Sequence, residues 1–201
     1  LGVLSALLAF GVAAGAFEIA PLQIAAILIT ALAVQFLGSF MTATRFEPRS
    51  ALVTALLLSL LLRSDAVAPL MIAAAIAIGS KFTLRLYGKH VFNPAAAGVA
   101  GILILSQTAM PGAAWTASGE WSAAIWFAAA LAAAGLLVAW RAARLDVPLI
   151  FFGAYAALIL SRALWLGDPL AAPMAQLQNG ALLLFAFFVI PDPKTSPDGA
   201  A

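Results

Sequence analysis

Long apolar stretches alternate with short polar segments along almost the whole chain. Eight apolar segments cover residues 1–17, 20–43, 50–62, 66–80, 94–110, 121–140, 147–165 and 177–190. Their apolar residues are continuous, whereas strands of a membrane barrel alternate apolar and polar residues. A backbone surrounded by lipid must pair its hydrogen-bonding groups internally, and a continuous apolar segment does so as a helix. The pattern predicts an all-α polytopic membrane protein with about eight transmembrane helices, forming one domain over residues 1–201.

Composition agrees with this prediction, because 65% of the residues are hydrophobic and 9% are charged. The mean hydropathy of +1.08 exceeds what a soluble core accommodates. No basic residue precedes the apolar run of segment 1–17, which favours a spanning helix over a cleaved signal peptide. Segments 50–62 and 66–80 are shorter than the roughly 20 residues that cross a bilayer. Either they recruit flanking residues, with Arg63 extended to the interface, or they are broken helices that end within the membrane.

The basic residues are unequally divided between the two sides that eight alternating helices define. Two of them, Arg63 and Arg162, fall on one side, and eight fall on the other. The eight are Arg45, Arg49, Lys81, Arg85, Lys89, Arg141, Arg144 and Lys194. The positive-inside rule places that side, and the N-terminus with it, in the cytoplasm. The acidic residues lie at segment ends or in loops, so we expect no carboxylate pathway for Na⁺ or H⁺.

Few residue types are available to bind a cofactor. The chain has no cysteine, which excludes iron–sulfur clusters, thiolate metal sites and covalent haem. The single histidine, His90, excludes a haem held by two histidines of this chain. An electron carrier would therefore be organic, such as a flavin or a quinone, or belong to a partner. The net charge of +2 indicates no nucleic-acid role, and no catalytic constellation is evident.

The densest group of charges lies between segments 66–80 and 94–110. Its candidate ligand-binding residues are Lys81, Arg85, Lys89, His90 and Asn93. On a helix continuing beyond residue 80, Lys81 and Arg85 share a face, and Gly88 marks a break. Asn93 followed by Pro94 is typical of a helix start, whose free N–H groups attract an anionic or carbonyl-rich ligand. The alternative is that these cations are topology determinants facing lipid head groups.

A second polar site follows the last apolar segment on the same side. Its candidate residues are Asp192, Lys194 and Thr195, and the Asp192-Pro193 pair repeats the pattern of a cap followed by proline. About one hundred residues separate the two helix starts, which is typical of transporters built from two halves with broken helices. The alternative for this site is a plain polar turn.

Two motifs together resemble one family. The first is Gly-Lys-His-Val-Phe-Asn-Pro-Ala over residues 88–95, and the second is Phe-Phe-Val-Ile-Pro-Asp-Pro-Lys-Thr over residues 187–195. In this order, with a Trp-Thr-Ala loop between them, they resemble the membrane subunits NqrB and RnfD. These belong to the Na⁺-translocating NADH:quinone oxidoreductase and the Rnf electron-transport complex. The resemblance covers residues 45–197, and the Lys-His form is closest to the short UnbU-like relatives of RnfD.

The resemblance implies ten helices in two inverted halves, in the inner membrane of a bacterium beside other membrane subunits of a redox complex. We expect this chain to stop after the eighth helix. The resemblance also implies riboflavin held non-covalently toward the cytoplasm, and FMN linked through its phosphate to a threonine of an outer loop. Ala123 and Ala124 stand where that threonine is expected, so we predict no covalent FMN.

Three functions fit these observations. The first is an electron-transfer subunit that binds riboflavin or FMN non-covalently. Asn93 and the N–H groups after Pro94 would bond the ring carbonyls, and Lys81, Arg85 and Lys89 would stabilise the reduced, anionic flavin. The second is a transporter for a small polar solute such as a flavin. The third is a structural subunit, without a cofactor, of a larger membrane assembly.

Overall fold

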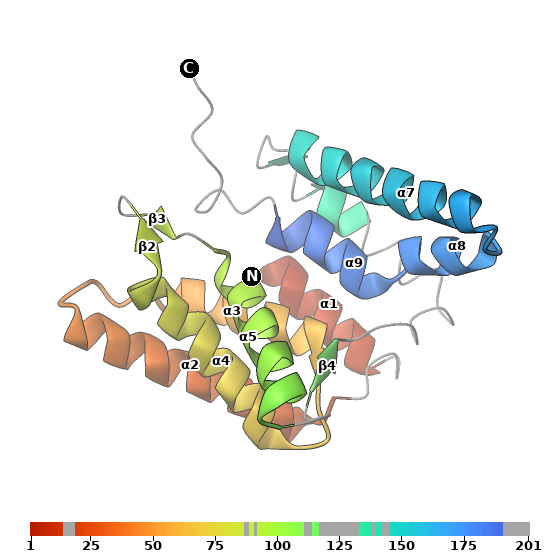
Figure 1. The fold of residues 1–201 in the computed structure, drawn as a ribbon. Coiled ribbons are helices and arrows are strands. Elements are labelled where there is room, and N and C mark those ends of the chain that lie inside the picture. The colour runs from red at the N-terminus through yellow and green to blue at the C-terminus, as the bar shows by residue number, and fades with distance from the viewer. Residues whose placement is uncertain are drawn as a thin grey trace. The chain divides into compact units, whose positions relative to one another are not determined.

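The computed structural model describes residues 1–13, 19–86, 89–90, 92–110, 114–116, 133–137, 140–141 and 145–190. The described part is mostly helical, with a few two-residue strands (Figure 1). The chain divides into two compact units, Leu1–Ala117 and Ser118–Ala201. The first contains α1 (Gly2–Ala13), α2 (Pro21–Met41), α3 (Pro48–Leu61), β1 (Leu62–Arg63), α4 (Val67–Thr83), β2 (Arg85–Leu86), β3 (Lys89–His90), α5 (Pro94–Thr108) and β4 (Trp115–Thr116). The second contains α7 (Asp146–Leu166), α8 (Ala171–Leu177), α9 (Gly180–Leu184) and the π-helix η2 (Phe185–Val189).

The helices follow the apolar segments of the sequence closely. Seven of the eight segments lie mostly in described helices, and 121–140 falls largely outside the described residues. The helices α2 and α7, each of 21 residues, are long and apolar enough to cross a membrane. The pair Ala171–Leu177 and Gly180–Val189, bent by 43°, would count as a third span if it crosses as one. The other four, α1, α3, α4 and α5, are shorter apolar helices, so eight spans and a single domain remain predictions.

Proline marks the starts of three helices in the first unit. Pro21, Pro48 and Pro94 are the first residues of α2, α3 and α5. Proline suits this position because its fixed φ is helical. The N–H group that proline lacks would also have no acceptor within the first turn of the helix. At α2, the backbone N–H of Ala20 donates to Gln23 Oε1 at 3.0 Å, which holds the helix start.

Small residues allow the helices of the first unit to approach closely. The helix α4 packs against both α2 and α5, and α3 packs on α2. A Cβ added to Gly98 of α5 would lie 2.7 Å from the carbonyl oxygen of Ala73 and 2.7 Å from Ala77 Cβ, both in α4. In the same way, Gly38 of α2 lies against the ring of Phe82 in α4. Packing of this kind replaces the hydrophobic drive for helices in lipid.

The helix ends of the first unit gather at two opposite ends because consecutive helices run antiparallel. One end, here called the cationic end, carries Arg45, Arg49, Lys81 and Arg85 and joins the C-termini of α2 and α4 to the N-termini of α3 and α5. At the other end, β1 pairs antiparallel with β4, with Leu62 opposite Thr116. Four of the eight basic residues that the sequence assigns to one side therefore lie at one end of the first unit, and the membrane topology itself remains a prediction.

Arg63 lies at the end opposite the cationic end, and it is 8% exposed. Its Nη1 donates to the carbonyl oxygens of Ser59 at 2.9 Å and Leu62 at 2.8 Å. The guanidinium thus folds back on the C-terminus of α3, where carbonyl groups attract a cation. Arg63 thus bonds the end of its own helix, and whether α3 and α4 recruit flanking residues to cross a membrane or end within it remains a prediction.

The second unit contains α7, the broken pair of α8 and α9, and η2. Asn179 begins α9, and its Oδ1 accepts a hydrogen bond from Ala181 N at 2.9 Å. The Phe151 ring of α7 meets the Phe185 ring of η2 edge to face, with centroids 5.8 Å apart. Gly135 lies so close to η2 that an added Cβ would be 2.5 Å from Phe187 Cβ. Aromatic contacts and one glycine therefore hold η2 against its neighbours.

Candidate functional site

Arg85 does not share a helical face with Lys81, so the prediction of a continuous helix through both is wrong. The helix α4 ends at Thr83, because Leu84 leaves the helical region with φ −104° and ψ 74°. Arg85 lies instead in β2, where it pairs with His90 of β3, while Leu86 pairs with Lys89. Its guanidinium carbon is 5.7 Å from the centroid of the Phe82 ring, a cation–π contact. Its Nε donates to the carbonyl oxygen of Lys81.

Lys81 is buried, with 4% of its surface exposed. Its ammonium group donates to Ser50 Oγ at 3.0 Å, which ties the last turn of α4 to the first turn of α3. The charge suits the C-terminus of its own helix. The Lys81 side chain therefore faces the start of α3.

Asn93 is the N-cap of α5 and Pro94 its first residue, as the sequence predicts. The Oδ1 atom of Asn93 accepts hydrogen bonds from Ala95 N at 2.9 Å and Ala96 N at 3.4 Å. Its carbonyl oxygen accepts from Ala97 N at 2.9 Å. The first N–H groups of α5 are thus engaged by Asn93 itself in this structure, and their bonding to a flavin carbonyl remains a prediction.

The structure brings five of the predicted residues into one region and leaves the other three untested. Lys81 and Arg85 are joined by a hydrogen bond, and strand pairing places the backbones of Lys89 and His90 beside β2. Asn93 begins the helix that packs on α4. The second site, Asp192, Lys194 and Thr195, lies outside the described residues, as do Ala123 and Ala124. Their roles, and the sharing of a pocket by the two sites, remain predictions.

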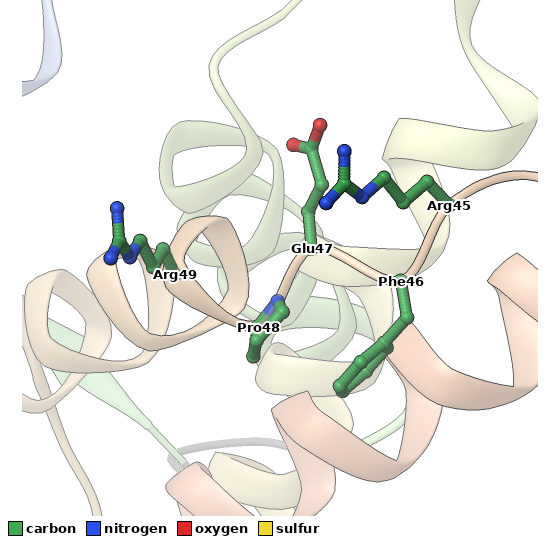
Figure 2. Close-up of a pocket in the computed structure, with 5 residues that line it drawn as sticks. All are labelled: Arg45, Phe46, Glu47, Pro48 and Arg49. Atoms are coloured by element: carbon green, nitrogen blue, oxygen red, sulfur yellow. The ribbon is translucent and has the colours of Figure 1, made fainter.

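The sequence reasoning missed a hollow at the cationic end. It has a volume of about 430 Å³ and is lined by Arg45, Phe46, Glu47, Pro48 and Arg49 between α2 and α3. Figure 2 shows the Arg45 side chain directed toward Glu47, with Arg49 turned away from both. The sequence signals only the start of α3 here, because Glu47-Pro48 repeats the pattern of a polar residue followed by proline seen at Asn93-Pro94.

Metal ligation has no basis in the part of the chain that the structure describes. No group of three or more His, Asp or Glu residues gathers there closely enough to hold a metal ion. The guanidinium and ammonium groups at the cationic end are instead suited to anions and carbonyl oxygens.

Comparisons with known protein families, characterised proteins and solved structures found no match to this chain.

Proposed function

We propose that this chain is a membrane subunit of a redox complex, similar to RnfD and NqrB, and that it binds riboflavin or FMN non-covalently. In this proposal it crosses the inner membrane of a bacterium about eight times, with its N-terminus and the cationic end in the cytoplasm. Its partners are the lipid bilayer and the other membrane subunits of the complex.

One observation carries the proposal, namely the convergence of cations and helix starts at a single end of the first unit. Arg85 lies beside the C-terminus of α4, and its strand pairs with the strand that carries Lys89 and His90. Asn93 begins α5 within the same antiparallel arrangement. A reduced flavin carries negative charge, and nearby cations stabilise that form and raise its potential.

The length of the helices is compatible with the topology in this proposal. At 1.5 Å per residue, the 14 to 17 residues of α3, α5 and α4 extend about 21 to 26 Å. A hydrocarbon layer is about 30 Å thick, so each helix needs the adjoining loops to complete a crossing. The strand pairs at both ends, β1–β4 and β2–β3, satisfy backbone groups where the helices stop.

The visible absorbance spectrum of the purified protein tests the proposal directly. We expect flavin bands in the native protein, and we expect acid precipitation to release all of the flavin because no covalent link is formed. The substitution Arg85→Gln should lower flavin occupancy, whereas Arg162→Gln on α7, an exposed arginine of the second unit, should not. Colourless protein that still co-purifies with redox partners would favour the structural role without a cofactor.

A transporter for a small polar solute is the second candidate, and one feature favours it. The α8–α9 pair is bent by 43° at a break capped by Asn179. Broken helices of this kind form substrate sites in many transporters. Uptake of riboflavin into liposomes containing the purified, chromophore-free protein would support this function over electron transfer.

A further inference from the structure

The hollow between α2 and α3 is built on a well-defined turn. Thr44 N donates to the carbonyl oxygen of Ser39 at 3.0 Å, and Ala43 adopts a left-handed conformation with φ 51°. The Phe46 ring meets the Phe36 ring of α2 edge to face, with centroids 6.0 Å apart. These contacts hold the backbone on both sides of Arg45. The arginine is therefore presented from an ordered segment, although its side chain is exposed.

The start of α3 carries an unusual excess of positive charge. Arg49 is the second residue of the helix, and Arg45 lies just before it. The buried ammonium group of Lys81 is 3.0 Å from Ser50 Oγ in the same turn. A helix N-terminus bears partial positive charge and is stabilised by anions, so three cations there oppose its dipole.

Glu47 offsets only part of this charge. It occupies the N-cap position of α3 but makes no side-chain cap hydrogen bond to the first turn. Figure 2 shows its carboxylate beside the Arg45 guanidinium, whereas Arg49 points away on the other side of Pro48. The Glu47 carboxylate thus lies beside one of the two arginines that line the hollow, and Arg49 adds a second positive charge to its lining, which favours a bound anion.

We propose that this hollow binds a phosphate ester, with Arg45 and Arg49 as its ligands. Guanidinium groups bind phosphate through paired, charge-assisted hydrogen bonds. Phe46 and Pro48 supply apolar walls for the organic part of the ligand. The volume of about 430 Å³ accommodates more than a phosphate group, and it lies within the range of small-molecule sites. Two sources share this chemistry, the head group of an anionic phospholipid and the phosphate of FMN. The second source rests on the proposed flavin function, and the first is independent of it.

The test compares three double variants in the full chain. Arg45→Gln with Arg49→Gln removes both guanidinium groups, and Arg45→Lys with Arg49→Lys keeps the charge but loses the paired hydrogen bonds. The matched control, Arg141→Gln with Arg162→Gln, removes two exposed arginines from the second unit. Circular dichroism verifies that each variant has the helical content of the native protein.

Two sets of probes distinguish the sources. Fluorescence titration of flavin-free protein with FMN and with riboflavin measures binding that depends on the phosphate. Native mass spectrometry after delipidation, with re-addition of phosphatidylglycerol or phosphatidylcholine, measures selective retention of an anionic head group. Binding through two exposed guanidinium groups should also weaken as salt is raised, because the Debye length falls to about 8 Å at 0.15 M.

We expect the glutamine variant to bind the phosphate ester about tenfold more weakly, the lysine variant to lose less, and the control to match the native protein. A loss confined to FMN, with riboflavin binding intact, identifies the nucleotide phosphate. A loss confined to phosphatidylglycerol identifies the lipid, and this result stands even if no flavin binds. The inference would be overturned if the native protein bound riboflavin and FMN equally and the glutamine variant retained lipid unchanged. That outcome would leave the proposed flavin function intact.

Discussion

Substitution of Gly98 by alanine tests whether close packing of α4 and α5 positions the cationic end. A Cβ at Gly98 would lie 2.7 Å from both the carbonyl oxygen of Ala73 and Ala77 Cβ. Ordinary contact begins at 3.4 Å, so the two helices must separate by about 0.7 Å. The obstacle is partly backbone, which cannot rotate out of the way as a side chain can.

The expected loss of stability is the difference between two opposing effects. Overpacking of a tight contact costs about 1–3 kcal/mol, whereas alanine in place of glycine inside a helix returns about 0.5–1 kcal/mol. The midpoints of the two ranges leave a net loss of about 1 kcal/mol, so overpacking dominates. For a chain of this size, this corresponds to a fall in melting temperature of about 2–4 °C.

The assay is thermal unfolding in detergent, followed by circular dichroism, with flavin occupancy measured on the same samples. Gly98 lies little more than one turn beyond Asn93, and Ala77 lies one turn before Lys81. Separation of the two helices should therefore lower flavin occupancy as well as stability. Gly101 gives a graded comparison, since its added Cβ would meet the Ile76 side chain at 2.9 Å rather than backbone and should cost less.

The matched control is Gly153→Ala on α7, where an added Cβ meets nothing within 4 Å. This variant should be as stable as the native protein or slightly more stable, because only the helix preference changes. Equal melting temperatures for Gly98→Ala and the native protein would refute the close packing of α4 and α5. An equal loss in both variants would instead point to a general intolerance of alanine in these helices.

Two further substitutions separate stability from binding. Asn93→Leu removes the hydrogen bonds to Ala95 N and Ala96 N, so it should cost about 0.5–2 kcal/mol of stability and release bound flavin from a still folded protein; full flavin occupancy in this variant contradicts the site assignment. Lys81→Met removes a buried ammonium group bonded to Ser50 Oγ and should change stability by less than about 1 kcal/mol, because an apolar side chain of similar size fits a buried site. Flavin occupancy measured by absorbance should nevertheless fall.

The helices of this protein are readable in the sequence because their cause is local. Continuous apolar runs predict them, and the Asn93-Pro94 pair predicts the start of α5 to the residue. The end of α4 was predicted wrongly because it depends on pairing. Arg85 lies in β2, which pairs with His90 of β3, and not in the helix. The four-residue spacing of Lys81 and Arg85 suits one helical face. Strand pairing with His90 nevertheless places Arg85 outside the helix.

Features that depend on distant residues left no usable signal. The β1–β4 pair joins Leu62 to Thr116 through two-residue strands, which are too short to show an alternating pattern. The π-helix at Phe185–Val189 lies against Gly135, about fifty residues earlier in the chain, so it follows from packing that a local reading does not contain. The hollow beside Arg49 likewise needs α2 and α3 to meet. Its arginines therefore served only as topology determinants in the sequence reasoning.

Lys81 helps to distinguish two explanations of the cationic end, namely ligand binding and a role in membrane topology alone. Topology determinants need only remain near the head groups, and the exposure of Arg45, Arg49 and Arg85 is compatible with that role. Lys81 does not need burial to serve as one, and burying an ammonium group costs free energy. Its 4% exposure and its bond to Ser50 Oγ therefore fit a charge held in place for electrostatic effect. If Lys81→Met leaves flavin and phosphate-ester binding unchanged, topology alone accounts for the cations at this end.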